Sequence, residues 1–344
     1  SDENIVLCNT RLAMFKKIIV FILFSAALLP QVQGKGKEKH TALSCVVNNF
    51  KRDMIYLDCP QTPEIRGEFH RNPGEEHLLT FDTDKIVTFR VNGQELEFFL
   101  EPGDSLHADI TYGDRLAETI LFSGSERAVD QNQFLWDLYR YRLSVHFKTS
   151  LNACVVLDHK PADRIAAAKK FSEEARKMLN ENKKKYSEAF INYVEATLDA
   201  LVGESQIYYP DLYASMRQKP ISEQGIGDYW TLLDNYQTRT DEASLRCAPY
   251  VDFLVKYMVY EKAKKSADRD AGLGKFLPTT VEDTYKLAVA TFKDAQLDAV
   301  LFRVLTDYVV QGKNIEEVER WIADYKQKYN KDKEYAKILD LLMQ

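Results

Sequence analysis

Short apolar runs alternate with turn residues between about Thr41 and Phe122, and no helical period separates them. This pattern is typical of short β-strands. The expected strands are residues 45–50, 55–59, 65–69, 78–81, 86–91, 95–100, 106–111 and 119–122. Strands at such close spacing predict an antiparallel β-sandwich or open barrel, and we assign residues 35–122 to this domain.

Two pairs of turn residues divide the later strands. Pro102 fixes φ at the first central position of a turn, and Gly103 supplies the positive φ of the second. Asn92 and Gly93 together favour the type I′ turn of a β-hairpin. The chain is therefore expected to reverse direction at both places.

Apolar residues recur at helical spacing from Ser123 onward. The expected helices are residues 126–147, those starting near 161 and 188, and residues 251–264, 281–291, 315–329 and 332–343. Pro161 suits a first helical turn, and Thr280 and Asn314 precede acidic residues as helix N-caps do. The fold class is therefore α+β, an antiparallel β-sandwich-like domain followed by an all-helical domain at residues 123–344.

The first 34 residues resemble a targeting segment. Lys16 and Lys17 give a positive start, residues 18–29 are almost wholly apolar, and small or compact residues end the segment. The apolar run is shorter than the roughly 20 residues that cross a bilayer. We expect residues 14–34 to be a signal peptide, which leaves no transmembrane anchor after cleavage and directs the chain to the periplasm or elsewhere outside the cytoplasm. Residues 1–13 precede Met14 and are expected to be a non-native upstream extension.

The composition narrows the range of partners. The net charge is −6 and the hydrophobic fraction is 45%. The apolar fraction is sufficient for packed cores. An acidic chain, however, lacks the positive electrostatic field that attracts nucleic acid. We therefore expect periplasmic or envelope proteins as partners, and no nucleic acid.

Export to an oxidising compartment makes the cysteines informative. Residues 45–50 and 54–59 flank a polar turn at 51–53, so an antiparallel hairpin centred there would place Cys45 opposite Cys59. A disulfide between them is one prediction, and two free buried thiols are the alternative, because strand register slips easily by one residue. The sequence does not decide whether Cys154 and Cys247 pair.

Residues 247–250 have the shape of a C-x-x-C redox motif, but Tyr250 stands where the second cysteine would be. A dithiol cycle needs that second thiol. We therefore expect Pro249 to open a helix and Cys247 to be an ordinary small residue before it.

Other residues that could bind a metal or a ligand have structural explanations. His70 and His77 flank a loop that favours a solvated turn over a metal site, and His107 alternates with apolar neighbours and is expected to face outward. Four aromatic residues at or near helical spacing favour core packing over a ligand platform: Trp136, Tyr139, Tyr141 and Phe147. No catalytic, cofactor-binding or metal-binding residue is assigned, and no cofactor is expected.

The run Leu100-Glu101-Pro102-Gly103-Asp104-Ser105-Leu106, the Phe122-Ser123-Gly124 transition and the order of strands before helices resemble one known family. They are similar to the N-terminal portion of the TlpA/ResA-like thiol-disulfide oxidoreductases of Gram-negative anaerobes. In that family an exported β domain and a helical region precede a thioredoxin-like domain.

The resemblance implies a non-catalytic role for this chain. The family's reaction is carried by a Trp-Cys-x-x-Cys motif, which this sequence lacks, and the chain stops where that domain would begin. We expect an accessory or scaffold region of such an oxidoreductase, truncated before its catalytic domain. One alternative is a complete exported binding or envelope-assembly module with a groove between the sandwich and the helices. Another is an enzyme whose site is assembled from scattered residues.

Overall fold

A computed structural model describes residues 38–70, 72, 74–92 and 96–344. The expected upstream extension at 1–13 and the signal peptide at 14–34 lie outside these residues. Residues 38–344 belong to one compact unit, and among its described residues eight strands precede the helices. The predicted α+β class is confirmed.

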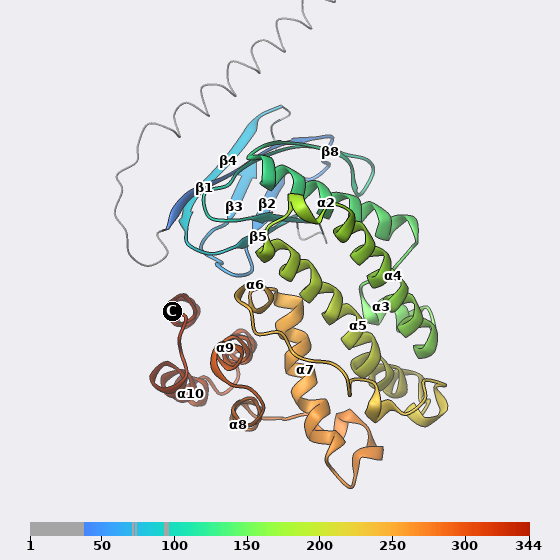
Figure 1. Cartoon of the computed structure of the whole chain (residues 1–344). Coiled ribbons are helices and arrows are strands. Elements are labelled where there is room, and N and C mark those ends of the chain that lie inside the picture. The colour runs from blue at the N-terminus through green and yellow to red at the C-terminus, as the bar shows by residue number, and fades with distance from the viewer. Residues whose placement is uncertain (1–37, 71, 73, 93–95) are drawn as a thin grey trace, which may run out of the picture. The chain divides into compact units, whose positions relative to one another are not determined.

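The strands form two four-stranded sheets (Figure 1). The first sheet has the order β4 (Glu76–Thr83), β1 (Lys39–Asn48), β7 (Ser105–Tyr112) and β8 (Ala117–Gly124). The second has the order β3 (Gly67–His70), β2 (Met54–Asp58), β5 (Val87–Val91) and β6 (Glu97–Leu100). Neighbouring strands are antiparallel except β1 and β7, which run parallel.

The inner faces of both sheets share one hydrophobic core. Along β7, Leu106, Ala108 and Ile110 are buried while the residues between them are partly exposed. They pack in one cluster with Leu43 of β1 and Phe89 of β5. The period-two pattern therefore produces a sandwich, since each sheet buries one face against the other.

The predicted hairpin between residues 45 and 59 is wrong. β1 pairs with β4 and β7, whereas β2 pairs with β3 and β5 in the other sheet. Asn49 follows β1 with a positive φ of 59°, and the chain crosses from one sheet to the other. Both edges of β1 are already occupied, so β2 cannot join it.

The turn at Pro102 and Gly103 has the predicted geometry. Gly103 has a φ of 92°, and the Asp104 N–H donates to the Glu101 carbonyl oxygen at 3.0 Å. The predicted two-residue turn at Asn92 and Gly93 is wrong, because Arg90 pairs with Glu97 and the Val91 N–H donates to the Leu96 carbonyl oxygen, so four residues separate the paired positions. Asn92 has a φ of 55°, and Gly93 lies outside the described residues.

The change from strand to helix occurs where the sequence places it. Gly124 ends β8 with a φ of 129°, and a Cβ atom there would lie 2.0 Å from the Ser105 carbonyl oxygen. That oxygen accepts a hydrogen bond from the Ser125 N–H at 2.8 Å. Only glycine fits this close approach, which fixes the start of helix α2 (Glu126–Ser144) against β7.

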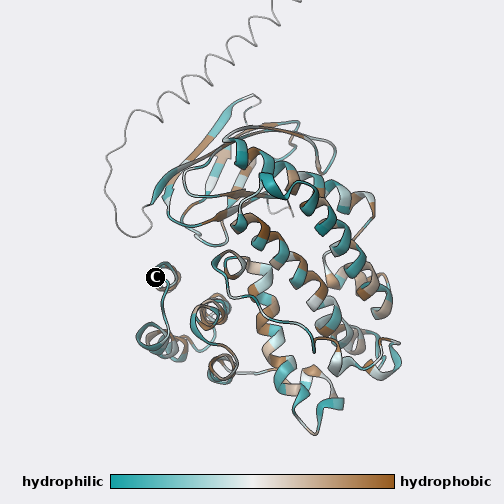
Figure 2. Ribbon diagram, in the orientation of Figure 1, coloured by the Kyte–Doolittle hydropathy of each residue, from teal (hydrophilic) through white to brown (hydrophobic). Residues whose placement is uncertain are grey.

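The helices follow in the order α2 (Glu126–Ser144), α3 (Leu151–Val156), α4 (Pro161–Glu181), α5 (Glu188–Arg217), α6 (Glu242–Leu245), α7 (Ala248–Lys264), α8 (Val281–Thr291), α9 (Asp294–Gln311), α10 (Ile315–Lys328) and α11 (Lys333–Leu342). Figure 2 shows many hydrophobic positions along α5 and α7, which lie in the helical core. Pro161 lies in the first turn of α4, and the Thr280 hydroxyl accepts from the Asp283 N–H, as predicted. The predicted cap at Asn314 is wrong, because that residue has a φ of 51° and its side chain makes no capping bond.

Helix α2 joins the sandwich to the helices. Trp136 and Tyr139 are buried in the sandwich core, while Tyr141 and Phe147 stack on Phe171 of α4. The predicted core role of these aromatic residues is confirmed. Among the described residues, no helix combines the length and apolar character needed to cross a membrane.

Candidate functional site

A cavity of about 280 Å³ lies between the loop after β2 and the helices α6, α7, α9 and α11. Most of its lining is apolar and includes Pro60, Pro63, Phe302 and Ile338. Small-molecule sites share this character, a largely apolar interior with few polar groups. Both the strand-rich segment and the helical segment of the chain contribute to its wall.

Gln61 and Arg246 connect those two segments at the cavity wall. The Gln61 Nε2 atom donates to the Arg246 carbonyl oxygen at 3.0 Å and to the Thr88 hydroxyl at 2.8 Å. The Arg246 Nε atom donates to the Ile86 carbonyl oxygen at 3.0 Å, and Nη1 lies 3.1 Å from a Glu334 carboxylate oxygen. The Arg246 side chain is therefore fixed at the junction.

The guanidinium of Arg246 retains unused hydrogen-bonding capacity. Its side chain is only 2% exposed, and among the described residues its Nη2 atom has no hydrogen-bond partner. The Thr306 hydroxyl, on another lining residue, also lacks one within the described part of the chain. Buried polar groups are normally paired, so these two atoms are exceptions within the described part of the chain.

The exposure of the lining residues locates the mouth of the cavity. Val310 of α9 is 73% exposed and Leu342 of α11 is partly exposed, whereas Leu245, Tyr335 and Ile338 are buried. The cavity therefore extends from a surface opening at the ends of α9 and α11 toward the buried residues.

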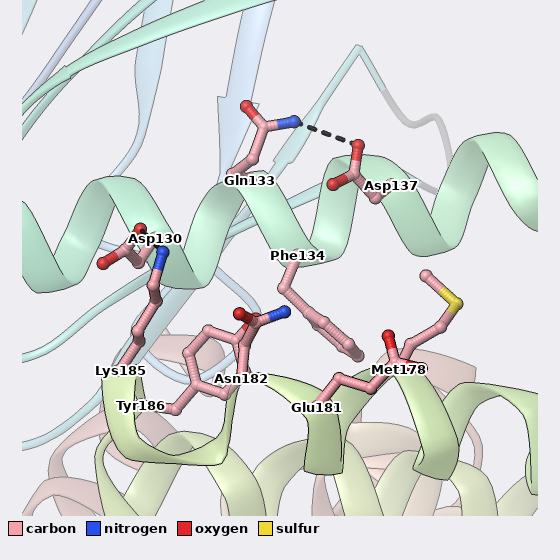
Figure 3. Close-up of a pocket in the computed structure, with 9 residues that line it drawn as sticks. All are labelled: Asp130, Gln133, Phe134, Asp137, Met178, Glu181, Asn182, Lys185 and Tyr186. Carbon is pink, nitrogen blue, oxygen red and sulfur yellow. Dashed lines mark hydrogen bonds and ion pairs between the residues drawn. The ribbon is translucent and has the colours of Figure 1, made fainter.

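A second cavity of about 320 Å³ lies between α2 and the end of α4 (Figure 3). Three carboxylates line it, and two of them are paired: Gln133 donates to Asp137 at 3.0 Å, and Lys185 lies 3.6 Å from Asp130. Burial, with Asp130 and Asp137 nearby, raises the pKa of Tyr186 to about 12. Because its polar groups largely satisfy one another, this cavity is the weaker candidate.

The four cysteines of the described chain are free and buried. Burial raises the pKa of the Cys45 thiol to about 12, of Cys59 to about 11 and of Cys247 to about 12. Since the thiolate is the reactive form, these groups are poor nucleophiles. The hairpin that motivated a Cys45–Cys59 disulfide is absent, and the two thiols are unbonded in the structure.

Cys247 occupies the N-cap position of α7. Pro249 lies in the first turn of that helix, as predicted, and the Cys247 sulfur lies 3.3 Å from the Thr197 hydroxyl. The side chain is fully buried. The residue therefore packs inside the helical core instead of presenting a thiol to solvent.

Alkylation tests this account of the thiols. A thiol with a pKa of about 12 is ionised in only about one molecule in 10,000 at pH 8. We expect iodoacetamide at that pH to leave Cys247 unmodified in the native protein and to label it in guanidinium chloride, as read by peptide mass spectrometry. Native labelling at the rate of an unfolded cysteine would contradict the burial of this thiol.

The histidines differ from one another. His70 is exposed, but His77 is buried and stacks on Phe69 with ring centroids 4.7 Å apart, so the predicted solvated turn is wrong for His77. His77 belongs to β4, and its ring packs on the sheet and is not exposed to water. In the described ranges, no group of three metal-ligating side chains occurs.

His107 faces away from the sandwich core, as predicted, and lies beside Ser44 and Glu76. Its Nδ1 atom is 2.7 Å from the Ser44 hydroxyl and 3.2 Å from a Glu76 carboxylate oxygen. A serine–histidine–acid relay needs the hydroxyl and the carboxylate on opposite ring nitrogens. Here both contact the same nitrogen, so the trio does not form such a relay.

Neither Gln61 nor Arg246 was identified from the sequence. Gln61 contacts a residue 185 positions away, and only the fold brings the two together. Comparison of the chain with family models, with curated proteins and with solved structures finds no match. The structure therefore defines a class, an α+β protein with two β-sheets, a following helical region and an apolar cavity between them.

Proposed function

We propose that this chain is the non-catalytic accessory or scaffold region of an exported thiol-disulfide oxidoreductase of the TlpA/ResA-like type. The resemblance of residues 99–125 to that family motivates the proposal. It is supported by the burial of Cys45, Cys59 and Cys247, whose raised pKa values make them unsuited to thiol exchange. In this proposal the region orients periplasmic or envelope proteins for a catalytic domain.

Insulin reduction tests the non-catalytic role. We expect the chain from Lys35 to Gln344 to leave the rate of insulin reduction by dithiothreitol at the buffer rate, because an exchange cycle needs an accessible thiolate. Turbidity of the released insulin chain measures the rate, and an active thioredoxin serves as positive control.

The variant Cys247→Ser provides the matched comparison for that assay. Catalysis above buffer that disappears in this variant would overturn the proposal, since it would place a working thiol at the start of α7. Catalysis that persists in the variant would also overturn it and would direct attention to the remaining cysteines.

The cavity favours a second candidate function, a non-enzymatic exported binding module. Residues from the loop after β2 and from four helices line one apolar space, and Arg246 adds a buried cationic group. A groove between sandwich and helices is the feature that such a module needs. Its test is whether the cavity takes up a ligand.

A further inference from the structure

Three large apolar side chains are exposed where the end of α3 meets the end of α5. Val156 of α3 is 70% exposed, Leu157 after it is 67% exposed, and Met216 in the last turn of α5 is 51% exposed. The Arg217 Nη2 atom donates to the carbonyl oxygens of Val155 and Val156, at 2.6 and 3.0 Å, so the two helix ends lie together. We call Val156, Leu157 and Met216 the apical patch.

The turn that carries Leu157 is fixed by hydrogen bonds to α5. The Tyr213 hydroxyl donates to an Asp158 carboxylate oxygen at 2.5 Å, and the Tyr209 hydroxyl donates to the His159 carbonyl oxygen. Burying the apical patch by a local rearrangement would break such bonds, which has a free-energy cost. Single exposed apolar residues are common, whereas neighbouring ones mark interaction sites. The fixed exposure of this patch therefore indicates a binding surface.

The surroundings of the apical patch are basic, although the whole chain has a net charge of −6. Residues 145–160 and 212–220 form this end of the molecule and contain a single acidic residue, Asp158. The same two segments contain four basic residues: Lys148, Lys160, Arg217 and Lys219. Asp158 lies 2.9 Å from the Lys160 ammonium and 3.8 Å from the Arg217 guanidinium. With histidine neutral, the segments keep an excess of positive charge, which complements an anionic surface.

We propose that the apical patch inserts into the surface of a membrane that contains anionic lipid. Val156 and Leu157 would enter the boundary between headgroups and acyl chains, and the surrounding cations would lie at the lipid phosphates. This combination of apolar side chains and basic residues attaches proteins to a membrane surface without spanning it. A stable protein–protein interface uses about 20–30 residues a side, far more than this patch supplies. Lipid is therefore the occupant that the patch fits.

Cosedimentation with lipid vesicles tests the proposal. The chain from Lys35 to Gln344 is used, because it contains the compact unit of residues 38–344 and omits the apolar run at 18–29, which would itself enter lipid. We expect binding to vesicles of equal parts phosphatidylglycerol and phosphatidylcholine at least about tenfold tighter than to phosphatidylcholine alone. Raising the salt concentration from about 0.05 to about 0.5 M should weaken the binding, because salt screens the headgroup charge.

The double variant Val156→Ser/Leu157→Ser tests the apolar contribution. It should weaken binding to the mixed vesicles at least about tenfold, because two apolar side chains no longer enter the lipid. Both positions are exposed, so the variant should fold normally. Leu121→Ser/Val310→Ser is the matched control, since those residues are 70% and 73% exposed on β8 and α9, and it should bind as the unchanged chain does.

The double variant Lys148→Gln/Lys219→Gln tests the charge contribution and should weaken binding to the mixed vesicles about tenfold. Lys183→Gln/Lys184→Gln removes the same charge from exposed positions just after α4. The 21 residues of α4 span about 30 Å and begin three positions after Asp158, so these lysines lie beyond the far end of that helix. This control should lose less than about threefold in binding.

Three results would overturn the proposal: no binding of the folded chain to the mixed vesicles, unchanged binding in Val156→Ser/Leu157→Ser, or equal losses in the two lysine variants. Light scattering provides a further check. A dimer that Val156→Ser/Leu157→Ser disperses, together with no vesicle binding, would assign the apical patch to a second copy of the chain and would also overturn it. Vesicle binding that is lost in the patch variants and kept in both controls would support the lipid assignment.

Discussion

Replacing Phe99 with alanine is expected to lower the free energy of unfolding by about 3–5 kcal/mol. Phe99 lies on β6 and is fully buried, but its ring packs with helices, 5.1 Å from the ring of Phe190 and 5.3 Å from that of Tyr193. Its removal would leave a cavity where the sandwich meets α5. Urea unfolding followed by circular dichroism measures the change.

The matched control for Phe99 is Leu121→Ala on β8. Leu121 is 70% exposed, so its truncation should change stability by less than about 0.5 kcal/mol. Because Asn132 of α2 bonds both the Phe99 N–H and its carbonyl oxygen, at 2.8 Å each, the backbone should stay in place in Phe99→Ala. A loss below about 1 kcal/mol in Phe99→Ala would show that sandwich and helices do not depend on this contact.

Replacing Arg246 with alanine is expected to cost about 3–5 kcal/mol, because it breaks a buried, hydrogen-bonded charge cluster. The Ile86 carbonyl oxygen would lose its donor, and Glu334 would lose one of its partners. Both groups lie at the junction of strands and helices, so the loss should reduce the stability of the whole unit. The midpoint of urea unfolding reports it.

Arg320→Ala on α10 is the control, since Arg320 is exposed and its loss should be nearly neutral. A double-mutant cycle between Arg246→Ala and Glu334→Gln should show a coupling of about 0.5–3 kcal/mol. Strictly additive effects in that cycle would contradict the role assigned to this ion pair.

The strands were predictable as elements, but their pairing was not. Alternation along residues such as Leu106 and Ala108 is a local signal, because each side chain faces opposite to its neighbour. The partner of a strand depends on distant segments that compete for its edges. Symmetric spacing around residue 52 suggested a hairpin, yet β4 and β7 occupy both edges of β1.

Helix starts show the same division between local and distant determinants. The Thr280 cap depends on residues three positions apart, and the structure contains it. At Asn314 the same kind of pattern failed: the residue adopts the left-handed conformation, and its side chain makes no capping hydrogen bond. A capping pattern in sequence therefore predicts a cap only where the backbone enters the helix from an extended conformation.

The cavity could not be predicted from the sequence. Arg246 is one arginine among many, and its contacts lie 88 and 160 positions away along the chain. Nothing in the neighbouring sequence distinguishes this buried arginine from a solvated one. Only the docking of α11 and the loop after β2 creates that environment.

The parallel pairing of β1 with β7 affects the order in which the molecule can fold. β1 lies in the interior of its sheet, between β4 and β7. Its residue Ser44 contacts His107 of β7, which lies 63 positions later in the chain. Such distant contacts form slowly, because a long loop must close first. Until β7 is synthesised, one edge of β1 has no partner strand, and β1 carries apolar residues such as Leu43 and Val47. The early part of the chain is therefore the segment most exposed to aggregation, and the first sheet is completed late.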